Sequence, residues 1–288
     1  MSLRQRLAEP SILLTPGIYD ALTATLAEAA GFEALYLSGA AVSYTRLGRP
    51  DIGLASVSEM VETMALVRDK TALPVIIDAD TGFGNALNAQ RTMRLYERAG
   101  ANALQIEDQT YPYRCGHLAN KSLISMQEMA GKVHAMADAR ASEETLIIAR
   151  TDAIAVEGFE YALDRSEAYV EAGADALFIE APQSLDQLQA IASRFNGRVP
   201  LMANMVEGGT TPIHAAADLE ALGYSIVIFP GGIVRALART AEEYYASLKT
   251  HGTNTPFKER MLDFAGLNDR LGLDGLLESG QRYDEREG

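Results

Sequence analysis

Two aspartates separated by one residue are the sharpest chemical signal in this 288-residue chain. Asp78 and Asp80 close an apolar run, and the glycine-rich residues 81–84 follow. Alternate side chains of a strand point to the same side, so the spacing predicts that the two carboxylates converge. Like charges so close raise each other's pKa unless a cation lies between them, and Mg²⁺ suits hard oxygen ligands of this kind. Glu107 is expected to contribute through water. The alternative is that the pair caps a helix beginning near Asn85.

The only cysteine lies between two basic residues, in the segment Arg114-Cys115-Gly116-His117. Cationic neighbours lower the pKa of a thiol, which can then act as an acid, a base or a nucleophile. The alternative is that Cys115 merely fills a small apolar site. A single cysteine cannot form an internal disulfide, so nothing in the sequence indicates an oxidising compartment.

Other polar side chains also follow apolar runs. Arg150 offers a planar fork that binds carboxylate or phosphate in bidentate fashion. Asn204 offers an amide, and Arg235 follows Gly231-Gly232, where a helix N-terminus could receive an anion. The sequence has neither the G-x-G-x-x-G fingerprint nor a P-loop, so it gives no indication of a nucleotide site. The further polar residues at such positions are Ser38, Asp108, Asp152 and Glu180.

Eight short apolar runs alternate with stretches of helical periodicity, a pattern typical of a parallel sheet covered on its faces. The predicted strands are Ile12–Thr15, Ala34–Ser38, Val75–Asp80, Ala103–Glu107, Leu146–Arg150, Ala176–Glu180, Pro200–Asn204 and Ser225–Phe229. No linker, proline-rich stretch or charge block divides them. We therefore predict an α/β fold, a (β/α)8 TIM-type barrel in which the strand ends above meet at one rim.

The chain continues for roughly 55 residues past the eighth strand, which is more than a barrel needs. We expect one domain over 1–288, with the barrel at about 10–250 and a C-terminal helical extension at about 253–288. The extension carries Leu262, Phe264, Leu267, Leu271 and Leu273. These side chains predict either packing on a partner subunit or an arm folded back on its own barrel.

The charge balance bears on the class of partner. With 25 Lys and Arg against 39 Asp and Glu, the net charge is −14, which argues against nucleic acid or an anionic membrane as the main partner. No apolar run reaches the ~20 residues of a membrane span, and the N-terminal residues do not read as a secretory signal. We expect a cytoplasmic protein that binds a small anion.

Seven motifs, taken in order over residues 10 to 250, resemble the isocitrate lyase and phosphoenolpyruvate mutase superfamily. They are Ser38-Gly39-Ala40, Pro50–Gly53, Asp78–Gly84, Ile106–Gln109, Arg114–His117, Ala149–Asp152 and Asn204–Gly209. The resemblance is strongest to the short branch that includes 2-methylisocitrate lyase, 2,3-dimethylmalate lyase, the alkylmalate lyases and carboxyphosphonoenolpyruvate mutase.

The resemblance implies specific roles for these residues. Asp78 and Asp80 would hold Mg²⁺ (or Mn²⁺), with Asp51 and Glu107 as outer ligands. Cys115 would be the general acid, Arg150 would stabilise the intermediate, and Tyr36 would be an active-site tyrosine and a candidate base. The implied substrate contacts are Ser38, Gly39, Ala40, Arg114, Gly116, His117, Glu180, Asn204 and Arg235. The family further implies an eighth helix exchanged between subunits of a homotetramer.

One departure from the family bears on the substrate. The lyase motif usually begins with lysine where this chain has Tyr113, which removes a cation from the site. Residues 205–209 are more like the dimethylmalate and alkylmalate branch. We expect a Mg²⁺-dependent lyase that cleaves a 2-hydroxy dicarboxylate, of 2-alkylmalate or 2-methylisocitrate type, to a 2-oxo acid and a carboxylic acid. The alternatives are an oxaloacetate hydrolase or decarboxylase, a phosphonate mutase, and a catalytically silent metabolite-binding barrel.

Overall fold

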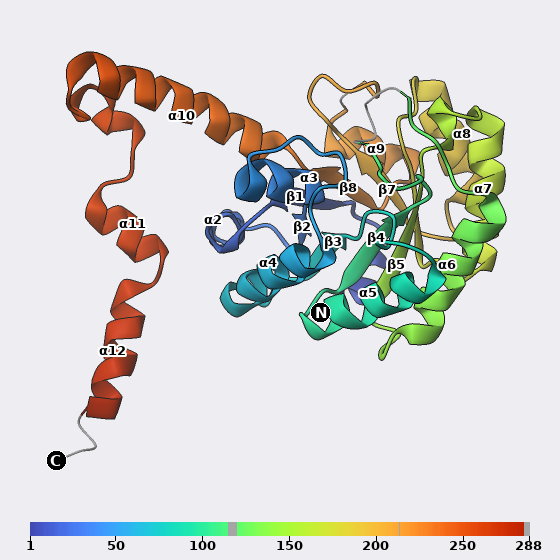
Figure 1. The fold of residues 1–288 in the computed structure, drawn as a ribbon, viewed down its shortest axis with the longest axis horizontal. Helices are drawn as coiled ribbons and strands as arrows, with labels where there is room; N and C mark the ends of the chain where they lie inside the picture. The colour runs from blue at the N-terminus through green and yellow to red at the C-terminus, as the bar shows by residue number, and fades with distance from the viewer. Residues whose placement is uncertain (115–119, 213, 285–288) are drawn as a thin grey trace. The chain divides into compact units, whose positions relative to one another are not determined.

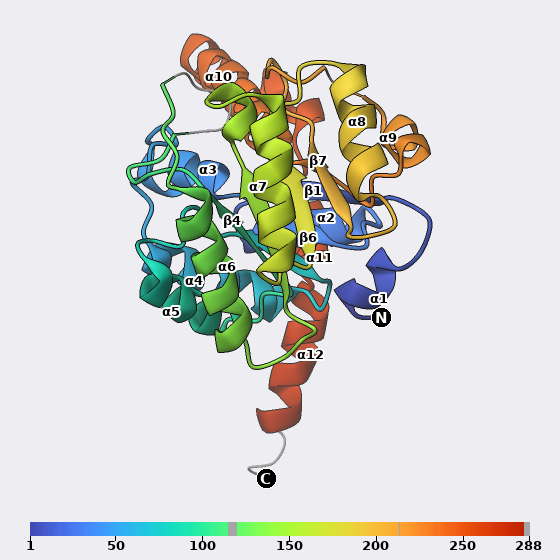
Figure 2. The same cartoon turned by 90° about the vertical axis from the view of Figure 1, so that its right-hand side faces the viewer.

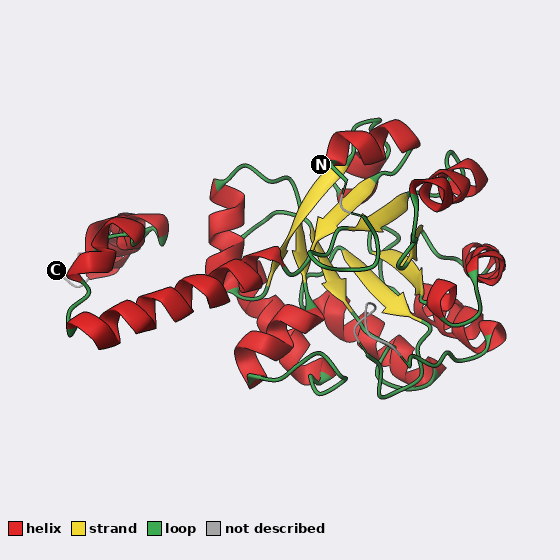
Figure 3. Cartoon of the chain, turned by 90° about the horizontal axis from the view of Figure 1, so that it is seen from above, coloured by secondary structure: helices red, strands yellow, loops and turns green. Residues whose placement is uncertain are grey.

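Eight parallel strands, neighbours in chain order, close into a barrel in the computed structural model (Figure 1). The structure describes residues 1–114, 120–212 and 214–284. Seen from above, the strands form a ring with helices outside it (Figure 3). The strands are β1 (Leu13–Ile18), β2 (Leu35–Leu37), β3 (Val75–Asp78), β4 (Ala103–Glu107), β5 (Leu146–Thr151), β6 (Ala176–Ile179), β7 (Leu201–Asn204) and β8 (Ile226–Phe229).

The predicted barrel is confirmed, and each of the eight apolar runs contributes a strand. β4 has the predicted bounds, whereas β3 ends at Asp78, two residues earlier than expected. The reason is local: Asp80 has φ 47°, a left-handed conformation that cannot continue a strand.

Helices cover the outside of the barrel, and Figure 2 shows α6 and α7 side by side. The helical elements of residues 1–233 are α1 (Leu3–Leu7), α2 (Ala21–Ala29), α3 (Gly39–Val42), the π-helix η1 (Ser43–Leu47), α4 (Val57–Lys70), α5 (Ala86–Arg98), α6 (Met126–Ala139), the 3₁₀ helix η2 (Ala153–Ala155), α7 (Phe159–Glu171), α8 (Leu185–Phe195) and α9 (Ala216–Leu222).

Asn85, and not the aspartate pair, caps helix α5. Its side chain accepts hydrogen bonds from the backbone N–H groups of Leu87 at 2.9 Å and Asn88 at 3.3 Å. The helix start is therefore satisfied without Asp78 or Asp80. This leaves both carboxylates available for another purpose.

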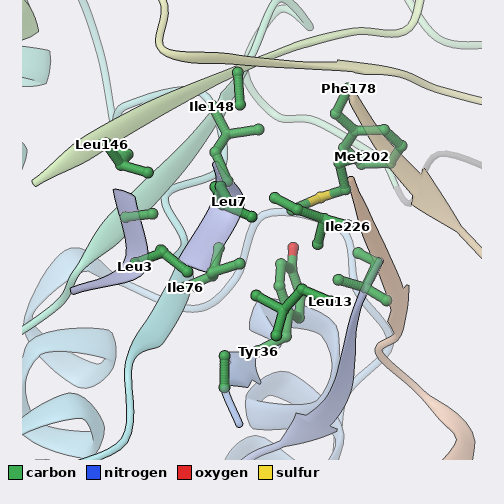
Figure 4. Close-up of a cluster of buried hydrophobic side chains, with 14 residues drawn as sticks. Leu3, Leu7, Leu13, Tyr36, Ile76, Leu146, Ile148, Phe178, Met202 and Ile226 are labelled. Carbon is green, nitrogen blue, oxygen red and sulfur yellow. The ribbon is translucent and has the colours of Figure 1, made fainter. Parts of the chain in front are cut away.

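The short helix α1 seals the amino-terminal end of the barrel. Leu3 and Leu7 pack in one buried cluster with the first residues of several strands, among them Leu13, Leu146 and Ile226 (Figure 4). Burying such apolar surface stabilises the fold by roughly 25 cal/mol per Å². Since this end is closed by packed leucines, the polar residues gather at the opposite, carboxyl end.

The chain divides into two compact units, Met1–Ile233 and Val234–Gly288. The second contains most of α10 (Gly232–His251), the 3₁₀ helix η3 (Thr255–Arg260), α11 (Phe264–Arg270) and α12 (Leu273–Asp284). Within it, the rings of Tyr244 and Phe257 meet edge to face at 5.4 Å. No residue of α11 or α12 is buried within the single chain. The predicted exchange of a C-terminal helix between subunits stays a prediction. Over the described ranges, none of the helices combines the length and apolar character needed to cross a membrane.

Gly17 supplies a test of barrel closure. A Cβ there would lie 2.2 Å from the backbone oxygen of Pro230, so β1 and the end of β8 could not keep their approach. We predict that Gly17→Ala lowers the free energy of unfolding by about 1–3 kcal/mol or more. The control is Gly131→Ala in α6, where a Cβ meets no atom within 4 Å and where we expect a gain of about 0.5–1 kcal/mol. Urea denaturation measures both, and an unchanged midpoint for Gly17→Ala would contradict the packing described here.

Candidate active site

The carboxyl ends of β3, β4 and β5 bring charged side chains together. Asp78 is the last residue of β3 and pairs in register with Gln105 of β4, while Glu107 of β4 pairs with Arg150 of β5. Glu107 and Arg150 form a buried ion pair at 3.2 Å. Neighbouring strands therefore deliver an acidic group and a basic group to the same rim.

Asp78 and Asp80 do converge, but through a turn and not through strand alternation. A Cβ built on Gly39 would lie 3.2 Å from Asp78 Oδ2 and 3.2 Å from Asp80 Oδ1. Both carboxylates thus face the start of α3, and glycine leaves them room. The predicted convergence holds, whereas the predicted mechanism was wrong because the left-handed Asp80 breaks the strand.

The Asp78 carboxylate is fixed by donors from three directions. The backbone N–H of Asp80 lies 3.2 Å from its Oδ1, and the Gln105 amide lies 3.4 Å from the same atom. Tyr36 donates to Gln105 Oε1 at 2.8 Å and so orients that amide. Burial raises the pKa of Asp78, and it outweighs the charge of Arg150 and the hydrogen bonds from the backbone of Asp80 and Gly39, which lower it.

Three neighbouring carboxylates each keep one buried oxygen without a hydrogen-bond partner among the described residues: Asp51 Oδ1, Asp80 Oδ2 and Glu107 Oε1. Burial and the charge of Asp78 raise the pKa of Asp51 to about 6. Burial raises the pKa of Asp80 far more, with Asp78 and Asp51 adding to it, and burial also raises that of Glu107. The cluster therefore has more negative charge than its surroundings neutralise.

These oxygens fit a divalent cation. Uncommitted carboxylate oxygens are the ligands that Mg²⁺ prefers, and Mg²⁺ retains several waters. Within the described ranges, no three His, Cys, Asp or Glu side chains form a ligand set by themselves. Asp78 and Asp80 would be the direct ligands, with Asp51 and Glu107 beyond them.

Arg150 is clamped by Asp152. Its Nε donates to Asp152 Oδ2 at 2.8 Å and its Nη2 to Oδ1 at 3.2 Å, while the guanidinium lies 5.1 Å from the centre of the Phe178 ring. Lys121 donates to Asp152 Oδ1 at 2.7 Å. Burial raises the pKa of Asp152, but the two cations outweigh burial and lower it. Asp152 thus stays ionised and holds the Arg150 fork in one orientation.

Asp108 holds Asp152 and the end of β5 in place. It accepts hydrogen bonds from the Thr151 hydroxyl at 2.6 Å, the Asp152 backbone N–H at 3.0 Å and the Tyr169 hydroxyl at 2.8 Å. Arg165 forms an ion pair with it at 3.2 Å. Because Thr151 ends β5 and Asp152 follows it directly, Asp108 fixes the end of β5 that carries Arg150.

The predicted substrate contacts fall in two places. Ser38 is buried, and its hydroxyl accepts the N–H of Ala41, so Ser38, Gly39 and Ala40 form the turn that opens α3 beside the aspartates. Across the barrel, Asn204 of β7 donates to Glu180, the residue after β6, at 3.3 Å. Asn204 Oδ1 is buried and has no partner among the described residues.

Tyr36 and Tyr113 are both donors in this environment. Burial, with Asp78 next, raises the pKa of Tyr36 well above its usual value, and its hydroxyl already donates to Gln105. Burial and the charges of Asp80 and Asp51 likewise raise the pKa of Tyr113, whose hydroxyl in turn lowers the pKa of Asp51 and Asp80. A tyrosine that keeps its proton is poorly suited to act as a base.

The remaining predicted residues are only partly described. Cys115, Gly116 and His117 lie outside the described residues. The backbone of Arg114 is held by Gln109, whose amide donates to the Arg114 carbonyl at 2.7 Å. Arg235 belongs to the second unit, so its role also stays a prediction.

Sequence reasoning placed Asp152 among the polar strand ends without giving it a role, and it missed two residues that hold the site. Gln105 could have been found as a polar residue in the middle of an otherwise apolar strand. Lys121 carries no sequence signal, since only the folded chain brings it to Asp152.

Asp152 generates a prediction about stability. Asp152→Asn would leave Lys121 and Arg150 buried without their shared counter-charge, so we expect a loss of about 3–5 kcal/mol in the free energy of unfolding. Glu167→Gln is the matched control, because Glu167 also binds two cations, Arg194 and Arg198, but at the surface. There we expect at most about 1 kcal/mol. Chemical denaturation measures both losses. Equal losses in the two variants would show that the buried ion pairs of Asp152 stabilise the fold no more than the surface ion pairs of Glu167.

The chain was compared with known proteins. The profile of the phosphoenolpyruvate phosphomutase family matches residues 3–249. The 2,3-dimethylmalate lyase of Eubacterium barkeri is 40% identical over 281 residues, covering 98% of this chain and 96% of that protein. The 2-methylisocitrate lyase of Aeropyrum pernix is 44% identical over 270 residues, covering 94% and 86%.

Solved structures of the same group are similar throughout. Oxaloacetate acetylhydrolase, bound to the inhibitor 3,3-difluorooxalacetate, superposes with a TM-score of 0.93 at 30% identity and covers 98% of this chain and 96% of that one. Phosphonopyruvate hydrolase, in complex with oxalate and Mg²⁺, gives a TM-score of 0.88 at 31% identity, covering 98% and 97%. On the strength of the profile match and these full-length similarities, the chain belongs to the isocitrate lyase and phosphoenolpyruvate mutase superfamily.

Proposed function

We propose that the protein is a Mg²⁺-dependent carbon–carbon lyase that cleaves a 2-alkylmalate, such as 2,3-dimethylmalate, into a 2-oxo acid and a carboxylic acid. The observation that carries this proposal is the group of buried, uncommitted carboxylate oxygens on Asp51, Asp80 and Glu107 beside the clamped Arg150. The relatives named as lyases of this substrate class support it.

The bound cation would polarise the 2-hydroxy carboxylate of the substrate and stabilise negative charge that develops there. Asp78 and Asp80 would hold it directly, and Mn²⁺ would be able to replace Mg²⁺. The turn of Ser38, Gly39 and Ala40 would receive the same end of the substrate through its hydroxyl and backbone. The solved relative that binds oxalate and Mg²⁺ together supports this pairing of ion and small diacid.

The protein groups would then move two protons. A carboxylate of the cluster, Asp51 or Glu107, takes the proton of the substrate 2-hydroxyl, since the raised pKa of Tyr36 disfavours it as the base. The bond between C2 and C3 breaks, C2 becomes the ketone of the 2-oxo acid, and the electron pair moves to C3 as an enediolate. Arg150 stabilises that negative charge. Cys115 donates its proton to C3, which completes the carboxylic acid.

Tyr113 favours a dicarboxylate over a tricarboxylate. It is buried beside Asp51 and Asp80 and keeps its proton, so it brings a neutral donor where related lyases carry an ammonium. A 2-alkylmalate has one negative charge fewer than 2-methylisocitrate and needs less compensation. The neutral donor at Tyr113 therefore supports a substrate of the dimethylmalate branch.

A second candidate is hydrolysis of oxaloacetate to oxalate and acetate. The similarity to oxaloacetate acetylhydrolase over the whole chain supports it. Oxaloacetate is also a diacid with two negative charges, so the same argument from Tyr113 applies. The products distinguish the two reactions.

The testing experiment is mass-resolved product analysis with Mg²⁺ and, in parallel, with a chelator. The panel contains 2,3-dimethylmalate, other 2-alkylmalates, 2-methylisocitrate, isocitrate, oxaloacetate and phosphonopyruvate. We expect a 2-oxo acid and a carboxylic acid from a 2-alkylmalate, abolished by the chelator. Turnover of oxaloacetate alone would overturn the lyase in favour of the second candidate.

Cys115 gives a prediction about the second proton transfer. We expect Cys115→Ser to lower kcat by about 10²–10⁴-fold, because a serine hydroxyl is a far weaker acid than a thiol. Binding of oxalate with Mg²⁺, measured by calorimetry, should be nearly unchanged and serves as the control for folding. Near-full turnover by the variant would assign the acid elsewhere.

Tyr113 gives a prediction about specificity. Tyr113→Lys restores a cation, so we expect the ratio of kcat/KM for 2-methylisocitrate over 2,3-dimethylmalate to rise by about tenfold or more. Tyr161→Lys, an exposed tyrosine on α7, makes the same change of type away from the site and should leave the ratio unchanged. If both variants keep the wild-type ratio, Tyr113 does not set the substrate charge.

The family resemblance further supports a cytoplasmic homotetramer in which C-terminal helices are exchanged. The exposed apolar residues of α11 and α12, including Phe264, Leu276 and Leu277, agree with such burial against a partner. Light scattering of the full chain should give four times the monomer mass of 31.1 kDa. A monomer in solution would contradict this assembly.

A further inference from the structure

The turn after β3 is conformationally strained. Asp80 has φ 47° and Phe83 has φ 60°, and the glycines between and after them, Gly82 and Gly84, have φ 78° and 146°. A non-glycine residue with positive φ is strained and persists only when its surroundings enforce that conformation. Something must therefore hold this turn in place.

Hydrogen bonds from three elements hold it. Within the turn, Gly82 N–H donates to the Ala79 carbonyl at 2.8 Å. From β4, the Glu107 N–H donates to the Asp80 carbonyl at 2.8 Å. From α5, the Thr92 hydroxyl donates to the Gly82 carbonyl at 3.2 Å. The carbonyl between these two, that of Thr81, is held by a fourth group.

That group is the ammonium of Lys132, which donates to the Thr81 carbonyl at 3.1 Å. Lys132 lies on the inward face of α6 with Met129, Val133 and Met136 and is only 3% exposed. Among the described residues, the Thr81 carbonyl is the only hydrogen-bond acceptor that the structure gives it. Burial lowers its pKa, while the charges of Glu128 and Asp108 raise it.

A buried lysine is costly for the fold. Lysine is almost never fully buried unless it is paired, because its ammonium loses its hydration. Its neighbours on α6 are apolar, so methionine would suit this position better if packing were its only purpose. Packing alone therefore does not explain why a lysine lies at this position.

We propose that Lys132 is a positioning residue for the metal site: its ammonium pins the Thr81 carbonyl and so keeps the Asp80 carboxylate turned toward Gly39. The Thr81 carbonyl is part of the peptide bond between Thr81 and Gly82, one residue after Asp80. Anchoring this carbonyl prevents the turn from relaxing toward an extended conformation. This inference rests on the proposed role of Asp80 as a metal ligand. It adds to the metal site a residue of α6 that is not one of the carboxylates.

The alternative is that Lys132 only ties α6 to the barrel. The two roles differ in what its replacement changes. Lys132→Met removes one stabilising hydrogen bond and also removes the cost of a buried ammonium, so these two effects on stability oppose each other. A positioning role predicts weaker metal binding with little change in the stability of the metal-free protein. A purely structural role predicts the reverse.

The experiment uses the full chain, stripped of metal with a chelator and titrated with Mn²⁺ while electron paramagnetic resonance reports the free ion. We expect Lys132→Met to bind Mn²⁺ about 10- to 100-fold more weakly than wild type. The thermal midpoint without metal should not fall, and the rise in midpoint on adding Mn²⁺ should shrink. Lys70→Met, at an exposed lysine on α4, is the matched control and should bind as wild type does.

The outcomes separate this inference from the proposed function. If wild type binds no Mn²⁺, the proposed metal site itself fails, and the inference fails with it. If wild type binds and Lys132→Met binds equally well, only the inference is overturned. Should Lys132→Met not fold, Lys132→Ala, which also removes the donor, is titrated instead and is also expected to bind more weakly than wild type. Wild-type affinity in that variant, or failure of both variants to fold, would identify Lys132 as a determinant of the fold alone.

Discussion

The structure depends on an excess of negative charge buried at the carboxyl ends of the barrel strands. Asp108 and Asp152 are matched by Arg165, Lys121 and Arg150 at hydrogen-bond distance. Among the described residues, Asp51, Asp78 and Asp80 have no cationic side chain at that distance, and Glu107 pairs there only with Arg150, which Asp152 already holds. Carboxylates in this position must hold protons or share a cation. That imbalance supports the proposed site for a divalent ion and a small acid, even though the chain as a whole is acidic.

Most of the surrounding fold can be understood as a frame for these charges. Helix α1 closes the opposite end of the barrel with leucines, which leaves the carboxyl end for polar groups. Asp108 and the backbone of Asp152 lock the end of β5, so that the guanidinium of Arg150 has one orientation. The left-handed turn at Asp80 and the missing Cβ of Gly39 bring two carboxylates to one point. Rigid groups aimed at the place where charge develops are the main source of electrostatic catalysis in enzymes.

The sequence could predict the parts of this arrangement that are determined by hydrophobic periodicity or by residue type. Apolar runs ending in acids indicated eight strands and one polar rim, because parallel strands place their ends together. Strand alternation failed at Asp80, since nothing local to Asp78-Ala79-Asp80 announces a positive φ. Tyr36 was a candidate base from resemblance alone, and only its buried contact with Gln105 indicates a donor. Lys121 and Lys132 reach the site from distant segments, so only tertiary structure could reveal them.

The central claim is that the buried carboxylates at the end of β3 hold a divalent ion together with a small diacid. Its most direct test is a crystal structure of the protein with Mn²⁺ and oxalate, in which the anomalous scattering of manganese locates the ion. The account predicts an anomalous peak bounded by the carboxylates of Asp78 and Asp80, with oxalate between it and the Arg150 guanidinium. An ion elsewhere, or oxalate bound at Arg150 with no ion beside the aspartates, would contradict it.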